Sequence, residues 1–480
     1  MLVNQLLNNI ENVENERKII KTDDGAKDGQ NKCSQCGSTD ISVNAKTGKL
    51  RCNFCRHEFE FQKIKGFEEN IKDLEGEVVG SGIQDIVADT NNVVTFKCSS
   101  CGAEVVIDTA ETTQARCHWC RNTLSVNQQI PNGAVPDVVL PFNITKADAK
   151  EQIEKFVGKR KFFAHPKFKE EFTTDNIMGV YFPYMLVDIN SHARFVGQGE
   201  HEVRRYTSED SNNRDTYYDA DLYDVEREFD LTIEGLTVES SIDKLNKNDS
   251  SKTNNIINSI MPFDIENCVK YNANYLKGFA SEKRDTNIDD LRPIVDEQSK
   301  DIARFVVNDS LKNYDRGVCW QVEQLNVKGK QWKAAYLPVW LYSYQQEKNE
   351  DKKTLHYVAV NARTKETMGS VPIHIPKLFG VSALVEALGF LVTLLVTFEY
   401  EKLFLLSGFV FFIINYLRYR NSNARHYYEK ETKTKMFNLR KMDVFIRTQR
   451  GLTNSNIVGV NNTKVRGQNI SERILNSIKK

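Results

Sequence analysis

The chain has 480 residues, and its 65 lysines and arginines balance its 65 aspartates and glutamates. This length predicts two to four domains, and the balance of charge excludes an overall basic or acidic protein. The charge is unevenly distributed, however, because residues 418–480 hold 15 Lys/Arg against four Asp/Glu. This basic tail is expected to lie against anionic lipid of the cytoplasmic leaflet. A nucleic-acid-binding arm and a merely solvated tail are the alternatives.

The first 31 residues are polar, and a short helix is expected around residues 6–20. Residues 1–9 contain no basic region followed by an apolar core, so no cleavable signal is expected. The long arm before the apolar segments is therefore predicted to be cytoplasmic. Eight of the ten cysteines form four Cys-x-x-Cys pairs, which in a reducing compartment indicate metal binding rather than disulfides.

Two segments repeat the same cysteine pattern. All four cysteines of the first copy recur 65 residues later, and 15 residues separate the two pairs in each copy. A gap of two residues lets both thiolates of a pair bind one ion, and the intervening residues fit a β-hairpin. We therefore predict two zinc ribbons, at residues 32–62 and 93–130, joined by a helical connector at 63–92. Their zinc ligands are expected to be Cys33, Cys36, Cys52, Cys55, Cys98, Cys101, Cys117 and Cys120.

Four thiolates complete the tetrahedral coordination of zinc and leave no position for water or substrate, so both sites are expected to be structural. His57 and His118 lie beside ligands and are interpreted as surface residues or neighbours of the ligands. Cys268 and Cys319 are interpreted as small hydrophobic residues rather than nucleophiles. The sequence has no phosphate-binding glycine loop, nucleophile elbow or His-Glu metal motif, and we expect no enzymatic activity.

Residues 137–376 contain short aromatic and β-branched runs and a faint duplication. Residues 139–144, followed by a helical pattern to Val157, match residues 260–265, followed by a helical pattern to Phe279. Residues 180–186 match residues 335–341, and each run contains a proline, which suggests an edge strand or a bulge. Two α+β units of one type are therefore predicted. The acidic, tyrosine-rich residues 204–230 are expected to be strands of a solvated sheet, with a binding surface as the alternative.

Two apolar runs follow. Residues 378–398 contain one ionisable group, Glu386, and residues 403–417 contain none. At about 1.5 Å per residue, the first run is long enough to cross a bilayer, and the second needs its flanking Arg418 and Tyr419 to do so. We predict a transmembrane helical hairpin at 378–417, with both long arms cytoplasmic because basic residues flank the pair. A buried helical hairpin of a soluble domain is the alternative. Glu386 is expected to face a partner such as Asn415, and a functional role is the alternative.

Several motifs together resemble one family. They are the double Cys-x-x-Cys repeat, the run at 114–124, the link at 129–137, the Tyr-Leu-Pro-Val-Trp-Leu strand at 336–341 and the terminal apolar pair. They are similar to bacterial membrane-associated proteins with transcription-factor-B-type zinc ribbons, some of which carry a label linking them to a primosomal helicase. The resemblance implies zinc binding, a membrane location and a scaffold role beside flotillin-like or phage-shock proteins. It brings no catalytic residues, and this chain lacks a helicase's phosphate loop.

The predicted fold class is therefore multidomain: two small β zinc ribbons, a duplicated α+β region and a C-terminal transmembrane helical hairpin, followed by a basic cytoplasmic tail at 418–480. The predicted function is a bacterial adaptor in the cell membrane, with two spans and both termini cytoplasmic, that recruits protein partners. The alternative is a membrane-tethered nucleic-acid-binding protein. The basic residues of the ribbons would then contact phosphate, namely Lys46, Lys49, Arg51, Arg56, Lys63, Lys97, Arg116 and Arg121, together with Trp119.

Overall fold

We describe a computed structural model of the chain. It describes residues 18–20, 33, 35–38, 41–44, 49–59, 66–83, 93–97, 104–108, 115–116, 123–124, 129–131, 136–210, 213–240, 257–271, 273–276, 279–282, 284, 286–349, 352–395, 406–419 and 427–452. These include most of residues 136–452. The cysteines of the second predicted ribbon, the last part of the basic tail and most of the polar N-terminal segment lie outside the described residues.

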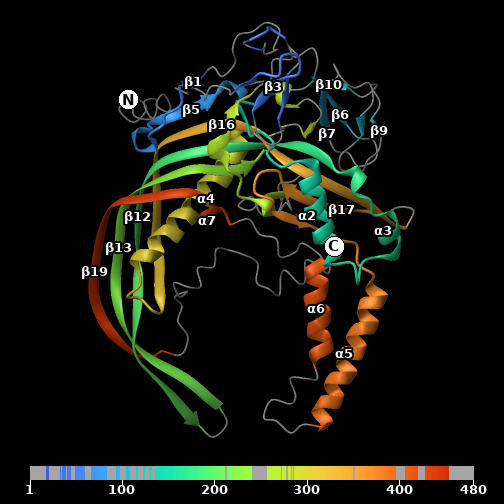
Figure 1. Cartoon of the computed structure of the whole chain (residues 1–480). Helices are drawn as coiled ribbons and strands as arrows, with labels where there is room; N and C mark the ends of the chain where they lie inside the picture. The colour runs from blue at the N-terminus through green and yellow to red at the C-terminus, as the bar shows by residue number, and fades with distance from the viewer. Residues whose placement is uncertain are drawn as a thin grey trace.

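The described chain is mostly β. A 14-stranded mixed sheet curls into a half-barrel, and few helices accompany it (Figure 1). The predicted fold class is therefore wrong, because one continuous sheet replaces the separate α+β units. The strands of this sheet are β1(Lys18–Ile20), β5(Gly76–Gly80), β6(Val93–Lys97), β7(Glu104–Asp108), β10(Gln129–Pro131), β11(Val138–Val139), β12(Met178–Asp210), β13(Asn213–Glu239), β14(Val269–Lys270), β15(Ala280–Glu282), β16(Gly317–Asn349), β17(Lys352–Asn361), β18(Thr367–Gly369) and β19(Lys433–Leu452).

Two smaller sheets, six α-helices and several short 3-10 turns complete the described elements. The sheets consist of β2(Ile41–Val43), β3(Leu50–Cys52) and β4(Glu58–Phe59), and of β8(Ala115–Arg116) with β9(Thr123–Leu124). The helices are α2(Lys146–Gly158), α3(Pro166–Glu171), α4(Ile288–Val307), α5(Ile375–Leu395), α6(Ser407–Tyr419) and α7(Tyr428–Glu431). Helix α4 packs its apolar face beneath the arch, where Leu291, Val295 and Ile302 share a core cluster with Trp332 of β16 (Figure 1).

The antiparallel pair β12–β16 is the centre of the sheet. The two runs that the sequence matched to each other lie side by side in it, with Val180 opposite Val339 and Tyr184 opposite Ala335. Both prolines fall where the outer neighbour of the strand changes. Beside Pro183 the neighbour of β12 changes from β15 to β13, and beside Pro338 the neighbour of β16 changes from β11 to β17. Proline lacks the N–H group of a ladder hydrogen bond, so it fits a gap between neighbours better than an uninterrupted ladder.

Other local predictions are wrong. The helical pattern after residue 265 does not continue to Phe279, since its described residues form short 3-10 turns and the strand β14. The described part of the helical connector forms β5 between two 3-10 turns. Here Gly80 approaches Asp137, a buried residue whose carboxylate accepts hydrogen bonds from the N–H groups of Gly82 (2.7 Å) and Ala334 (2.8 Å). A buried carboxylate therefore joins the connector to β16, and this contact replaces helical hydrogen bonds. Residues 18–20, at the end of the expected N-terminal helix, form β1.

Strand β19 explains part of the charge asymmetry. It carries six Lys/Arg and one Asp, and it pairs along its length with β13, which carries nine Asp/Glu and two Arg. The acidic residues 204–230 are strands, as expected, and they form the β12–β13 hairpin. Part of the basic tail thus lies against protein carboxylates: Arg440 lies 3.6 Å from Glu228, and Thr448 donates to Asp221 at 2.6 Å.

Helices α5 and α6 pack against each other and project from the body (Figure 1). The prediction that this helical hairpin crosses the membrane twice is wrong. Among the described residues, one helix is long and apolar enough to cross a membrane by length and composition, at Ile375–Thr393. Helix α6 has 13 residues, about 20 Å, which is shorter than a hydrocarbon core of about 30 Å. The buried-hairpin alternative does not fit either, because only 17% of the apolar window in α5 is buried.

The pairing of β13 with β19 can be tested at the ion pair formed by Arg227. This side chain is 1% exposed, and it donates to both carboxylate oxygens of Asp443, at 2.5 and 3.2 Å. Asp443→Ala should destabilise the fold by about 3 kcal/mol in urea denaturation, because it leaves a buried guanidinium without its counter-charge. Arg440→Ala, at a pair whose arginine is 81% exposed, should cost less than about 1 kcal/mol. Equal effects of the two substitutions would contradict this assignment.

Candidate metal centre and apolar helix pair

The first ribbon consists of two similar turns that carry the cysteines. In the first turn, Gly37 N–H donates to the carbonyl of Cys33, and in the second, Arg56 N–H donates to the carbonyl of Cys52, both at 2.8 Å. Both residues have positive φ angles, 71° for Gly37 and 63° for Arg56. This left-handed conformation directs the N–H groups of each turn toward its sulfur atoms. Glycine adopts it without strain, whereas arginine adopts it at a cost.

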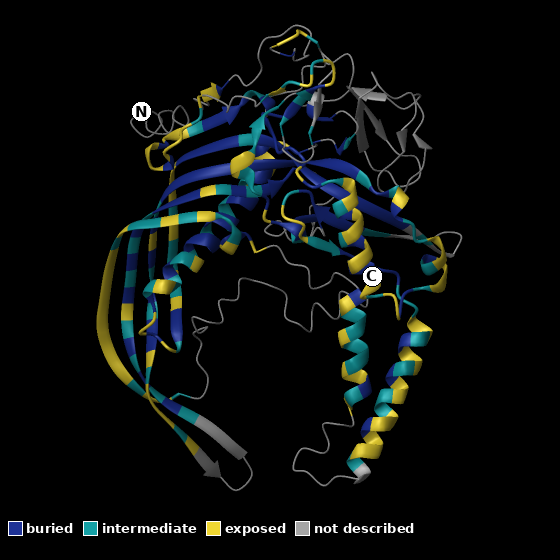
Figure 2. Cartoon of the chain, viewed as in Figure 1, coloured by how far each residue is buried: buried dark blue, intermediate teal, exposed yellow. Residues whose placement is uncertain are grey.

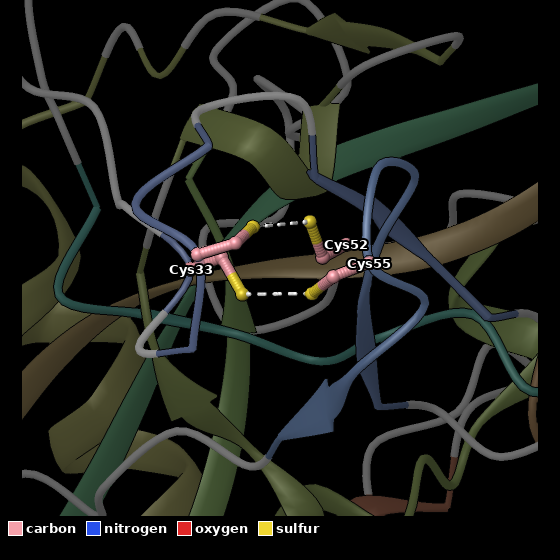
Figure 3. Close-up of side chains that lie close together, drawn as sticks. Cys33, Cys52 and Cys55 are labelled. Atoms are coloured by element: carbon pink, nitrogen blue, oxygen red, sulfur yellow. Dashed lines mark hydrogen bonds between the residues drawn. The ribbon is translucent and has the colours of Figure 1, made fainter.

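The two turns bring four sulfur atoms together. The sulfurs of Cys33, Cys36, Cys52 and Cys55 all lie within 4.8 Å of one another. Cys33 to Cys55 and Cys36 to Cys52 both measure 3.5 Å between sulfurs (Figure 3). Sulfurs bound to zinc at about 2.3 Å in a tetrahedron lie about 3.8 Å apart, so the cluster has the size that zinc requires. All four are free cysteines, so their sulfurs are available to bind a metal ion.

The electrostatics of the cluster also favour a cation. The pKa of Cys52 is lowered to about 6, and the largest cause is a hydrogen bond from the backbone N–H of Cys55. The pKa of Cys55 is instead raised to about 12: the N–H of His57 lowers it, but burial and the neighbouring thiols Cys36, Cys33 and Cys52 together outweigh this contribution. The thiols therefore oppose one another's ionisation. Zinc bound between them would remove this repulsion by holding all four as thiolates.

The second ribbon can be compared only through its described strands. In the first copy, Leu50 pairs with Phe59 and Arg51 with Glu58; in the second, Ala115 pairs with Leu124 and Arg116 with Thr123. Each pair is displaced by the same 65 residues as the cysteines, so this part of the repeat has the same register. Cys98, Cys101, Cys117 and Cys120 lie outside the described residues, and their zinc site stays a prediction. His118 and Trp119 also lie outside them.

Both ribbons are joined to the large sheet. Leu50 of β3 is fully buried in the core cluster that contains Tyr275 and Leu276. The second ribbon is connected through β7, which pairs with β15, and β15 in turn pairs with β12. Of the basic residues considered for nucleic-acid contact, Lys49 and Arg51 are half-buried and Arg56 is exposed. Lys46 and Lys63 lie outside the described residues.

The helix pair is held together near residue 408. Glu386 of α5 accepts a hydrogen bond from Gly408 N–H at the start of α6, at 2.7 Å, and Ser407 donates to the carbonyl of Val385 at 3.3 Å. A Cβ atom at Gly408 would lie 2.3 Å from the carbonyl oxygen of Ser382, so only glycine allows this approach. Glu386 thus caps the N-terminus of α6, where a carboxylate is favoured by the helix dipole. Its expected partner Asn415 donates instead to the carbonyl of Phe411.

A cavity of about 580 Å³ was not anticipated from the sequence. It opens where β12, β13 and β16 meet residues 261–268. Asp188 lines it and accepts hydrogen bonds from Gly235 N–H (2.7 Å), Gln331 (2.8 Å) and Lys333 (3.0 Å). Asp188 is therefore held in place by hydrogen bonds within the protein. The residues of the cavity come from distant strands, so no local motif could have indicated it.

The remaining sequence candidates are not assembled into a site. Burial raises the pKa of the Cys268 thiol to about 12, consistent with a small apolar side chain, whereas Cys319 is exposed, contrary to expectation. His57 stacks on Phe59 at 5.9 Å between ring centroids and is not part of the four-sulfur cluster.

Within the described residues, these features define a β-rich protein with a four-cysteine cluster of the zinc-ribbon kind and one candidate membrane span. The chain is a distant homologue of "Uncharacterized protein YdjG" of Bacillus subtilis (strain 168), with 24% identity over 347 residues. The similarity covers 71% of this chain and 89% of that protein. No family model matches the chain. No solved structure matches it either.

The sulfur geometry predicts a loss of zinc on substitution of one ligand. Cys52→Ser in the full-length protein should lower bound zinc by about one ion per chain, measured by mass spectrometry of the metal, because three thiolates bind zinc far more weakly than four. Cys319→Ser, an exposed cysteine outside the cluster, is the control and should retain the wild-type zinc content. Wild-type protein without zinc, or Cys52→Ser protein with its full content, would contradict the assignment.

The contact between α5 and α6 predicts a second effect. Gly408→Leu should lower the Tm of the purified protein, because its side chain would overlap the backbone of α5. Gly380→Leu, on α5 with open space around its Cβ position, should not lower it. Glu386→Leu should cost about 1 kcal/mol as a lost helix cap, whereas Glu386→Gln keeps an acceptor oxygen and should cost less. Identical Tm values for Gly408→Leu and Gly380→Leu would rule out this packing.

Proposed function

We propose that this chain is a membrane-anchored adaptor, in which zinc-stabilised ribbons recruit a protein partner and α5 is inserted in the bilayer. The observation that carries the proposal is the exposed apolar surface of the helix pair. Phe379, Leu384 and Leu388 of α5 are each more than 60% exposed, and Phe409 of α6 is 62% exposed. Exposed residues occur along the length of α5 (Figure 2), and its apolar residues are distributed around the helix rather than along one stripe, as lipid contact would require.

The base of the helix pair supports an anchor rather than a loose arm. Leu378 and Tyr419 are buried in the same core cluster as Phe163 and Ala164. The hydroxyl of Tyr419 accepts a hydrogen bond from Phe163 N–H at 2.9 Å, and Val371 N–H donates to the carbonyl of Tyr419 at 3.3 Å. The body is therefore fixed relative to α5. A membrane that holds α5 would hold the sheet and the ribbons at a defined orientation.

The zinc sites proposed for the ribbons are structural, which supports a binding role rather than a catalytic one. A closed four-thiolate site contributes folding free energy and leaves no open coordination position for a reaction. The cytoplasmic side for the ribbons and the recruitment of flotillin-like or phage-shock proteins come from the sequence and its family resemblance. The alternative, nucleic-acid binding through the ribbons, draws on their basic residues. A salt-dependent shift of DNA or RNA by the purified full-length protein would favour that alternative.

The membrane anchor is tested by fractionation. Wild-type protein should stay in membranes washed at alkaline pH. A triple variant, Leu384→Lys, Leu388→Lys and Leu391→Lys, should move to the soluble fraction, because each lysine near the centre of an inserted helix costs about 3 kcal/mol. All three leucines are more than 50% exposed, so the changes do not disturb the protein core. The control is Val203→Lys with Val327→Lys, two exposed valines on the sheet strands.

The adaptor role is tested separately by crosslinking from membranes. Full-length wild type and Cys52→Ser protein should both remain membrane-bound, but the Cys52→Ser variant should lose the proteins that crosslink to the wild type. If the wild type and the Cys52→Ser variant crosslink to the same proteins, the ribbons do not recruit those proteins. If wild-type protein is soluble without detergent, the anchor and the adaptor proposal both fail.

A further inference from the structure

Six cationic side chains surround the body-proximal end of the helix pair. They come from three separate parts of the chain: the loop after α2, helix α3, and the ends of α5 and α6 that meet the body (Figure 1). We call this group the basic collar; it comprises Arg160, Lys161, Lys167, Lys169, Lys377 and Arg418. Lys377 and Arg418 flank the apolar runs in the sequence, but the other four lie more than 200 residues before them and join them only through the fold.

Backbone hydrogen bonds hold the collar together. Lys377 and Lys169 both donate to the carbonyl of Phe162, at 2.9 and 3.4 Å. Arg160 donates to the carbonyl of Arg418 at 3.0 Å, and Arg418 donates to the carbonyl of Lys159 at 3.4 Å. The loop after α2 is further fixed by His374, whose N–H donates to the carbonyl of Phe163. Four of the six cations are therefore positioned by carbonyl groups, which do not neutralise their positive charge.

Few carboxylates balance this charge. Within the part of the chain that the structure describes, one carboxylate lies within ion-pair distance of the collar, Glu171 at 3.9 Å from Lys167. The mutual repulsion is visible in the pKa values. Burial and then Lys377 and Lys161 lower the pKa of Lys169, and burial and then Arg418 lower that of Arg160. Such a concentration of cations with few counter-charges is favourable for an anion.

The position of the collar points to the kind of anion. It lies where the apolar helix pair meets the body, between exposed Leu384 and Leu388 on one side and the buried core on the other. At its centre Phe162 is 61% exposed, and the Lys377 ammonium lies 3.9 Å from the centroid of its ring. An exposed aromatic ring among lysines, adjacent to an apolar helix, is the composition of a membrane interface.

We propose that the basic collar binds the phosphate headgroup of an anionic phospholipid, with Phe162 inserted among the upper acyl carbons. This inference rests on the proposed membrane anchor and adds to it a lipid class and a membrane level. Arg160, Lys161 and Lys169 contact the headgroup, and the acyl chains lie along α5. The collar thereby fixes how deep α5 sits and sets the membrane plane at the end of the helix pair nearest the sheet.

The test uses native mass spectrometry of the full-length protein in mild detergent. Dioleoylphosphatidylglycerol, dioleoylphosphatidylcholine and inorganic phosphate are titrated separately. Wild-type protein should bind phosphatidylglycerol preferentially. Lys161→Gln with Lys169→Gln should weaken that binding about thirtyfold, since each cation near anionic lipid contributes about a factor of five. Lys150→Gln with Lys312→Gln removes the same charge from exposed sites outside the collar and should leave binding unchanged.

Each outcome bears on one claim. Equal binding of the two lipids by a wild-type protein that resists alkaline extraction would overturn the lipid inference and leave the anchor intact. Competition by inorganic phosphate with equal affinity would assign the collar to a free anion and overturn the lipid assignment. A collar variant with wild-type lipid binding would also overturn it. Wild-type protein absent from washed membranes would overturn the anchor itself. Unchanged Tm values of both double variants show that the collar substitutions leave the fold intact.

Discussion

The antiparallel pairing of β12 with β16 is the constraint on which the rest of the structure depends. It extends from Met178 opposite Leu341 to Glu200 opposite Gly317, so it joins parts of the chain about 120 to 160 residues apart. Every other strand of the large sheet is connected to this pair either directly or through intervening strands. The first ribbon, the second ribbon and the helix pair thus acquire their positions from one long-range ladder, and none of them could be placed without it.

Charge complementarity supplies the second level of organisation. The acidic β13 and the basic β19 are each unfavourable alone, because like charges repel along a strand, but together they neutralise one another. Arg227 is buried where it pairs with Asp443, whereas Arg440 and Thr448 make contacts at the exposed side of this interface. The charge asymmetry of the sequence is therefore partly an internal feature of the sheet. The basic collar differs because four of its six cations bond to carbonyl groups and, among the described residues, one carboxylate forms an ion pair with it.

Taken together, these features arrange the molecule from a metal-stabilised end to an apolar end. Strand β3, which ends at Cys52 of the four-sulfur cluster, lies at the top of the view, and the helix pair leaves the body beneath α2 and α3 (Figure 1). Glu386 shows how a charged residue can serve structure between apolar helices, because it caps the start of α6. The proposed adaptor uses this arrangement: lipid would hold one end of the protein and a partner would meet the other.

The sequence by itself determined the four-cysteine cluster of the first ribbon, the register shared by the two copies, the matched runs around Pro183 and Pro338, and the apolar character of α5. These are local signals, because a Cys-x-x-Cys spacing or an apolar run is complete within a few residues. Only the tertiary structure decided the single continuous sheet, the pairing of β13 with β19, the cap from Glu386 to Gly408 and the basic collar. Each of these joins residues that are distant along the chain. Their contacts depend on which strand lies beside which, and strand neighbours are set by the whole core rather than by any local pattern.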